Sequence, residues 1–93
     1  MSAITAEQTL RLSAMYRLQW EEAQQCFVLL YPEGMVQLNG PAGEILSLID
    51  GSRSNADIIA TLANKFPEAE GLAEDVLAFL DDAQQHHWVS VRQ

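Results

Sequence analysis

The chain has 93 residues, of which 48% are hydrophobic, and it carries a formal net charge of −8 at pH 7. This length suits one domain, whose core buries only about 60–70% of the surface that the unfolded chain exposes. The hydrophobic content argues against disorder. The five basic residues are scattered along the chain, whereas nucleic-acid binding draws its affinity from clustered lysine and arginine, so the composition excludes a nucleic-acid binder.

Two further classes of protein are disfavoured by the sequence. No apolar run reaches the roughly 18 residues of a membrane span, and residues 1–14 lack the basic start and apolar stretch of a signal peptide. The single cysteine, Cys26, cannot form an internal disulfide, which is typical of a reducing compartment. The sequence therefore predicts a cytoplasmic protein with no membrane contact.

Residues 1–14 show no clear periodicity. We interpret them as a flexible N-terminal tail or as a dimer arm, and we expect residues 15–93 to form a single domain. A homodimer that exchanges its N-terminal strands is the assembly that such an arm would allow.

The first half of the domain has the patterns of strands. Tyr16, Leu18 and Trp20 alternate with polar residues, which is the period of a half-buried strand. After a polar loop at 22–25, the segment 26–31 is apolar, aromatic and β-branched, and 35–38 returns as a third strand. Between them we expect Gly34 to take the left-handed conformation of a three-residue hairpin loop. The three strands are expected to form an antiparallel meander.

The second half has the 3.6-residue period of helices, starting at 39–41, where Pro41 suits a first helical turn. Ser54 and Asp57 have the spacing of a capping box at the start of a second helix, and a third helix begins between Glu68 and Gly71. The expected inward faces are Ile45, Leu48 and Ile49; then Ile58, Ile59, Leu62, Ala63 and Phe66; then Leu72, Val76, Phe79, Leu80 and Ala83. The predicted fold class is α+β, a three-stranded antiparallel β-meander followed by three α-helices.

Residues that could carry chemistry are few. Cys26 has no neighbouring base in the sequence, and a free cysteine usually packs as a small hydrophobic residue. His86 and His87 are adjacent on the third helix, so they point in different directions, and the chain has no HExxH-type spacing. We therefore expect no catalytic residue, no metal and no cofactor.

Three segments in order, LLYPEGMVQLN at 29–39, GEILSLIDG at 43–51 and DVLAFLDDAQQHHWV at 75–89, resemble the PqqD family of pyrroloquinoline quinone biosynthesis, and RLQWEEAQQ at 17–25 adds to the likeness. The resemblance implies a winged-helix-like fold and a non-catalytic protein. Such a protein binds a ribosomally made precursor peptide of the PqqA type and presents it to a radical S-adenosylmethionine (SAM) enzyme of the PqqE type.

A strand edge beside a helix can capture an extended peptide as an added strand. The resemblance puts that peptide between the third strand and the last helix. The peptide-binding residues expected from it are Met35, Val36, Gln37, Leu38, Asp75, Val76, Phe79 and Asp82. Replacing Val36 by proline is expected to remove an edge donor and to weaken binding. The alternative function is a small enzyme or carrier acting on the quinone or its intermediates, which needs a pocket lined by Cys26, His86, His87 and nearby acidic residues.

Overall fold

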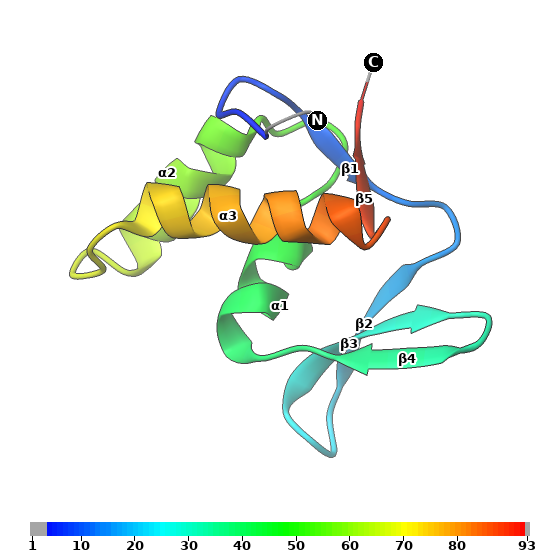
Figure 1. Cartoon of the computed structure of the whole chain (residues 1–93). Helices are drawn as coiled ribbons and strands as arrows, with labels where there is room; N and C mark the ends of the chain where they lie inside the picture. Colours follow the sequence, from blue (N-terminus) through cyan, green and yellow to red (C-terminus); the bar gives the residue numbers. More distant parts are fainter. Residues whose placement is uncertain (1–3, 93) are drawn as a thin grey trace.

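The computed structural model describes residues 4–92. The elements follow in the order β1 (Leu10–Leu12), β2 (Arg17–Glu21), β3 (Cys26–Tyr31), β4 (Gly34–Gln37), α1 (Gly40–Ser47), α2 (Asn55–Lys65), α3 (Leu72–Gln85) and β5 (Val89–Val91). The predicted meander followed by three helices is confirmed, and the structure adds a second sheet formed by β1 and β5. Figure 1 shows the three-stranded sheet on one side of the molecule and the helices on the other. Within residues 4–92, no helix has the length and apolar character needed to cross a membrane.

The three-stranded sheet is antiparallel, with β3 between β2 and β4. Its register places Leu18, Leu29 and Val36 in one row across the strands. Residues opposite each other in an antiparallel sheet share a face, and Leu29 of this row is fully buried in the core shared with the helices. The two-residue alternation of the sequence therefore places one face of the sheet against the helices.

The turn between β3 and β4 differs from the expectation. Its loop consists of Pro32 and Glu33, and Gly34 is already the first residue of β4, paired with Tyr31. The described glycines with a positive φ are Gly51 and Gly71, so the prediction of a left-handed Gly34 is wrong. A Cβ at Gly34 would stand 3.5 Å from the hydroxyl oxygen of Tyr31, an ordinary van der Waals contact, so neither φ nor space requires a glycine at this position.

The N-terminal segment is held against the domain at several points. β1 pairs with β5, with Leu10 opposite Val91. Asn55, the first residue of α2, is fully buried, and its Nδ2 donates to the carbonyl oxygen of Thr5 at 2.8 Å. The structure thus differs from the flexible tail expected over residues 1–14, of which 1–3 lie outside the described residues. A strand of three residues is too short to show a period in the sequence.

Local sequence signals account for where the helices begin. Asn39 caps α1, because its Oδ1 accepts from the N–H of Ala42 at 2.8 Å, and Pro41 lies in the first turn. The capping box of Ser54 and Asp57 at the start of α2 is confirmed. Gly71, with φ of 66°, precedes α3 and makes no side-chain cap.

The helices enclose the core with faces close to those predicted. Val76, Leu80 and Ala83 of α3 are buried, as is Leu62 of α2. Two residues expected to face inward do not, since Ala63 is exposed and Phe66 is 43% exposed. The reason for Phe66 is that α2 ends at Lys65, and the backbone leaves helical geometry at Phe66, with φ of −127°.

Candidate functional site

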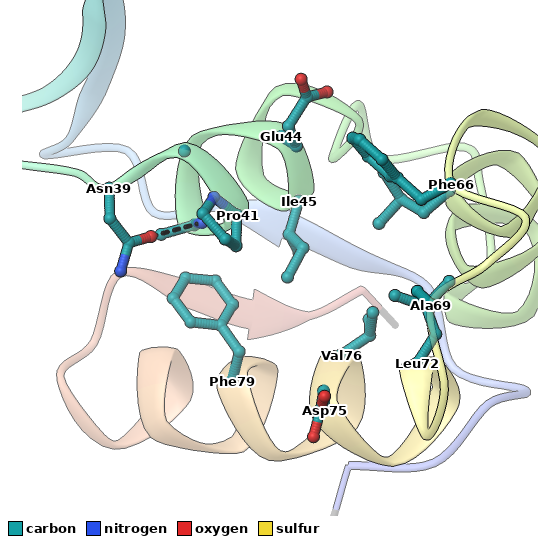
Figure 2. A pocket seen from close by; sticks show the side chains of 13 residues that line it. Asn39, Pro41, Glu44, Ile45, Phe66, Ala69, Leu72, Asp75, Val76 and Phe79 are labelled. Atoms are coloured by element: carbon teal, nitrogen blue, oxygen red, sulfur yellow. Dashed lines mark hydrogen bonds between the residues drawn. The ribbon is translucent and has the colours of Figure 1, made fainter.

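A cavity of about 600 Å³ opens between the start of α1, the end of α2 and the first half of α3. Figure 2 shows its walls, with Pro41 facing Phe79 at one end, and Phe66, Ala69 and Leu72 gathered at the other. The lining residues are Asn39, Gly40, Pro41, Ala42, Glu44, Ile45, Leu62, Phe66, Ala69, Leu72, Asp75, Val76 and Phe79. Most of these side chains are apolar, so the cavity suits an apolar ligand group.

One wall of the cavity is the start of α1, which consists of short residues. Gly40, Pro41 and Ala42 begin this helix, and all three line the cavity. On the facing side, Val76 is buried and Phe79 is half-buried. Space that a leucine or phenylalanine in the first turn of α1 would occupy is therefore left open.

The position of α1 is set by a glycine. A Cβ on Gly43 would lie 2.8 Å from Cδ2 of Phe27, so the helix backbone rests directly on β3. The short connection between β4 and α1 therefore leads straight into the cavity wall. Leu38 is buried in the core, and the next residue, Asn39, lines the cavity.

β4 is one of the two edge strands of the three-stranded sheet, β2 being the other, and no other strand pairs with its free outer edge within residues 4–92. The N–H of Leu38 donates to the carbonyl oxygen of Phe27 at 3.0 Å. Hydrogen-bonded pairs alternate along an antiparallel ladder, so Val36 also bonds toward β3, opposite Leu29. Met35 and Gln37 consequently turn their backbone N–H and C=O groups to the free edge.

The direction in which these backbone groups point corrects one expectation from the sequence. Val36 was expected to supply an edge donor, and that prediction is wrong, because its N–H faces β3. Proline at Val36 would break the ladder between β3 and β4 rather than the outer edge. The side chains of Met35 and Gln37 are exposed, whereas that of Val36 is half-buried on the face of the sheet that meets the helices.

The eight residues expected to bind a peptide fall into three groups. Asp75, Val76 and Phe79 line the cavity. The segment 35–38 forms the sheet edge and the connection that leads to the cavity. Asp82 lies farther along α3, outside the cavity lining, where its Oδ2 is 3.7 Å from Nδ1 of His86.

Sequence reasoning missed the wall contributed by α1 and by the link between α2 and α3. Asn39, Pro41, Ile45, Phe66 and Ala69 all line the cavity. The available signal was the run of short residues after Asn39, since a helix that begins this way cannot fill the space beside it.

Two of the residues that line the cavity are acidic. They are Glu44 and Asp75, and no lysine, arginine or histidine of residues 4–92 lines it. Both carboxylate oxygens of Glu44 accept from Nζ of Lys65 at 2.8 Å, whereas Asp75 is exposed. An apolar ligand that carries a positive charge beside Asp75 would therefore match both the walls and this carboxylate.

The residues needed for the alternative function do not share a pocket. Cys26 borders a smaller hollow, whose lining contains neither His86 nor His87. These histidines follow the end of α3, and the ring of His86 packs on Trp88 with a centroid distance of 5.0 Å. Among the residues that the structure describes, no three histidine, cysteine, aspartate or glutamate side chains form a group that could hold a metal ion.

Comparisons with known proteins agree with the resemblance seen in the sequence. The family described as "Coenzyme PQQ synthesis protein D (PqqD)" matches residues 26–89. The PqqA binding protein of Azotobacter vinelandii is 50% identical over 91 residues, which cover 98% of this chain and 99% of the relative. The PqqA binding protein of Pseudomonas aeruginosa is 54% identical over 77 residues, which cover 83% of this chain and 84% of the relative.

A solved structure matches the whole fold. It is the solution NMR structure of the PqqD truncation of Methylobacterium extorquens PqqCD, described as a functional, stand-alone recognition element for ribosomally synthesized and post-translationally modified peptides. The TM-score is 0.78 at 26% identity, and the match covers 95% of each chain. The resemblance is thus confirmed, and the chain belongs to the PqqD family, coenzyme PQQ synthesis protein D.

Proposed function

We propose that this protein is a non-catalytic chaperone of pyrroloquinoline quinone biosynthesis that binds a precursor peptide of the PqqA type. Its relatives from Azotobacter vinelandii and Stutzerimonas stutzeri are named PqqA binding proteins, and its structural relative is described as a peptide recognition element. The observation in this chain that carries the proposal is the free edge of β4, whose chain continues directly into the wall of an apolar cavity lined by the exposed Asp75.

The backbone of β4 supplies the first part of the binding site. Met35 and Gln37 each offer one N–H and one C=O to an added strand, and such bonds give affinity with little demand on sequence. Alternate residues of the added strand would face the same side as Val36, toward the helices. Selectivity then comes from what these residues meet beyond Val36.

The cavity supplies the second part. Val76 and Phe79 offer apolar surface, and burying one leucine- or phenylalanine-sized side chain contributes about 1.5–3 kcal/mol. Asp75, an exposed residue of the lining, can pair with a basic residue of the peptide. Asp82 lies two turns farther along α3 and could meet a second one. The proposed peptide-binding residues are thus Met35, Val36, Gln37, Leu38, Asp75, Val76, Phe79 and Asp82.

The test of the edge uses Gln37→Pro. This change removes one outward N–H and leaves the bonds between β3 and β4 in place, so the variant should fold. Calorimetry with a synthetic PqqA-type peptide should show a loss of affinity of about two- to tenfold, since one hydrogen bond contributes about 0.5–1.5 kcal/mol. Gln37→Ala keeps the N–H and should bind like the wild type. Equal affinities for a folded Gln37→Pro variant and the wild type would remove β4 from the site.

The peptide is then passed to a radical SAM enzyme of the PqqE type. The exposed faces away from β4 and the cavity remain available for that enzyme while the peptide is bound. The test measures modification of the PqqA-type peptide by the purified enzyme with and without this protein. Modification that is equally fast in both reactions would argue against delivery.

A homodimer is part of the same proposal. Because β1 and β5 form a separate two-stranded sheet, β1 of one copy could pair with β5 of another. Sedimentation over a wide range of protein concentration tests this, and a monomer throughout would contradict it.

A further inference from the structure

A second, smaller hollow of about 210 Å³ borders the start of α1. It shares Asn39, Gly40 and Glu44 with the larger cavity. Its other walls come from the end of the β2–β3 hairpin instead of from α2 and α3: Trp20, Gln25, Cys26 and Phe27. The first turn of α1 therefore forms a ridge between two hollows of different chemistry.

Two aromatic rings form one wall of the small hollow. Trp20 and Phe27 pack edge to face, with ring centroids 5.1 Å apart and an angle of 73° between the planes. Trp20 is 46% exposed although its Nε1 is fixed by a bond of 2.6 Å to Oε2 of Glu22. Phe27 is held from behind by the backbone of Gly43. Aromatic faces held in place beside water attract cations.

The one charged group that residues 4–92 contribute to the lining of the small hollow is an acceptor. Glu44 brings a carboxylate, which accepts from Lys65 and still has lone pairs to offer. The Nε2 of Gln25 donates to the carbonyl oxygen of Glu22, which leaves its Oε1 as an acceptor. No lysine, arginine or histidine lines the hollow. The donors of the lining, Nδ2 of Asn39 and the N–H of Gly40, carry no charge, so the charge of the lining favours a cationic donor.

The start of a helix ordinarily attracts anions through its free N–H groups. Here most of these groups are used or absent. The N–H of Ala42 is capped by Asn39, that of Gly43 bonds to the carbonyl oxygen of Asn39, and Pro41 has none. The acceptors and the aromatic wall therefore decide the sign of the charge that fits.

We propose that the small hollow binds one lysine or arginine side chain of the precursor peptide. The proposal rests on the proposed function, because the same peptide occupies β4 and the cavity. Its basic residue lies across the ridge of Asn39 and Gly40 from its apolar residue. The two hollows thus bind one apolar and one basic side chain of the same peptide. The net charge of −8 favours the approach of such a peptide.

The experiment uses Trp20 as a reporter. The chain has two tryptophans, so Trp88→Phe leaves Trp20 as the one source of tryptophan emission. A synthetic PqqA-type peptide is compared with peptides in which each lysine is replaced singly by norleucine and each arginine by citrulline. One replacement should lower affinity about fivefold and abolish the change in Trp20 emission that the unmodified peptide causes.

Protein variants locate the effect in the hollow. Glu44→Gln should lower affinity for the unmodified peptide, and the sensitive peptide replacement should then have no further effect. Lys65→Met breaks the ion pair with Glu44 but keeps the carboxylate, so it should bind at least as tightly as the wild type. Trp20→Leu should weaken binding of the unmodified peptide and leave binding of the replaced peptide unchanged.

The outcomes separate the two proposals. If the unmodified peptide binds and every replaced peptide binds equally well, the basic-residue site is wrong while the proposed function stands. If the replacement that lowers affinity is norleucine and that same peptide still changes Trp20 emission, the occupant is apolar and the proposal is overturned. If the unmodified peptide does not bind the wild-type protein, the proposed function itself fails.

Discussion

Gly43 lies so close to Phe27 that a Cβ on the glycine would be 2.8 Å from Cδ2 and 3.2 Å from Cβ of the aromatic side chain. This contact joins α1 to the central strand of the sheet. The two hollows lie on either side of the start of α1, and Phe27 lines the smaller one.

Replacing Gly43 by alanine should destabilise the protein. The methyl group would meet Phe27 near its ring root, where the side chain has little freedom to move, and overpacking costs about 1–3 kcal/mol. The better helix propensity of alanine, up to about 1 kcal/mol, offsets only part of this cost. Urea unfolding measures the change.

Gly40→Ala is the matched control for that measurement. A Cβ at Gly40 would have no neighbouring atom within 4 Å. This variant should therefore stay within about 0.5 kcal/mol of the wild type, as surface substitutions usually do. A Gly43→Ala protein as stable as Gly40→Ala would show that Phe27 can move aside.

Much of the fold could be predicted because its signals are local. The capping box of Ser54 and Asp57 and the switch of period near Asn39 each lie within a few residues, and both are confirmed. The pairing of β1 with β5 has no such signal. It joins segments at opposite ends of the chain, each three residues long, and only packing against the core makes the pairing favourable.

Part of the candidate binding site could also be predicted, because its sequence signals are local. Val76 and Phe79 were found from the apolar stripe of α3, and both line the cavity. The direction of each backbone group along β4 depends on the register with β3, which the sequence does not set, so Val36 was assigned to the wrong side. The cavity itself depends on the absence of long side chains from the first turn of α1.

Asn55 should be important for stability, because it ties the N-terminal segment to α2. Its side chain is fully buried, and its Nδ2 donates to the carbonyl oxygen of Thr5. Its backbone N–H donates to the carbonyl oxygen of Gln8 at 2.8 Å. Asn55→Ala would leave the carbonyl of Thr5 without its partner, which costs about 1–3 kcal/mol. Asn64→Ala, at an exposed position of the same helix, should cost much less. Thermal unfolding of both variants measures the difference, and equal losses would contradict this role.

Stability should depend on the ionisation of Asp50. Its Oδ1 accepts from the backbone N–H of Arg53 at 3.0 Å and from that of Ser52 at 2.9 Å. Both bonds lower the pKa of Asp50, and the bond from Arg53 has the larger effect. Because the pKa is lower in the folded state, the contribution is present above the unfolded value of about 3.9 and is lost as pH falls through the folded value.

The measurement for Asp50 is an NMR titration of its carboxyl group, together with unfolding of Asp50→Asn between about pH 2 and 6. The wild type should be the more stable protein at the upper end of this range, and the difference should shrink as the pH falls. A titration midpoint at or above the ordinary value for aspartate would contradict the expected direction.

The last prediction concerns the cavity. Ala69 is exposed in the link between α2 and α3 and lines the cavity, so a larger side chain there can fill the space without entering the core. Ala69→Phe should leave the free energy of unfolding nearly unchanged. It should weaken binding of a PqqA-type peptide by about 10- to 100-fold, because burial of one apolar side chain, about 1.5–3 kcal/mol, is lost.

Ala73→Phe, exposed on α3 and outside the cavity lining, is the matched control and should bind normally. Calorimetry after circular dichroism has confirmed folding decides the matter. If Ala69→Phe binds as tightly as Ala73→Phe, the peptide does not enter the cavity, and β4 would have to carry recognition alone.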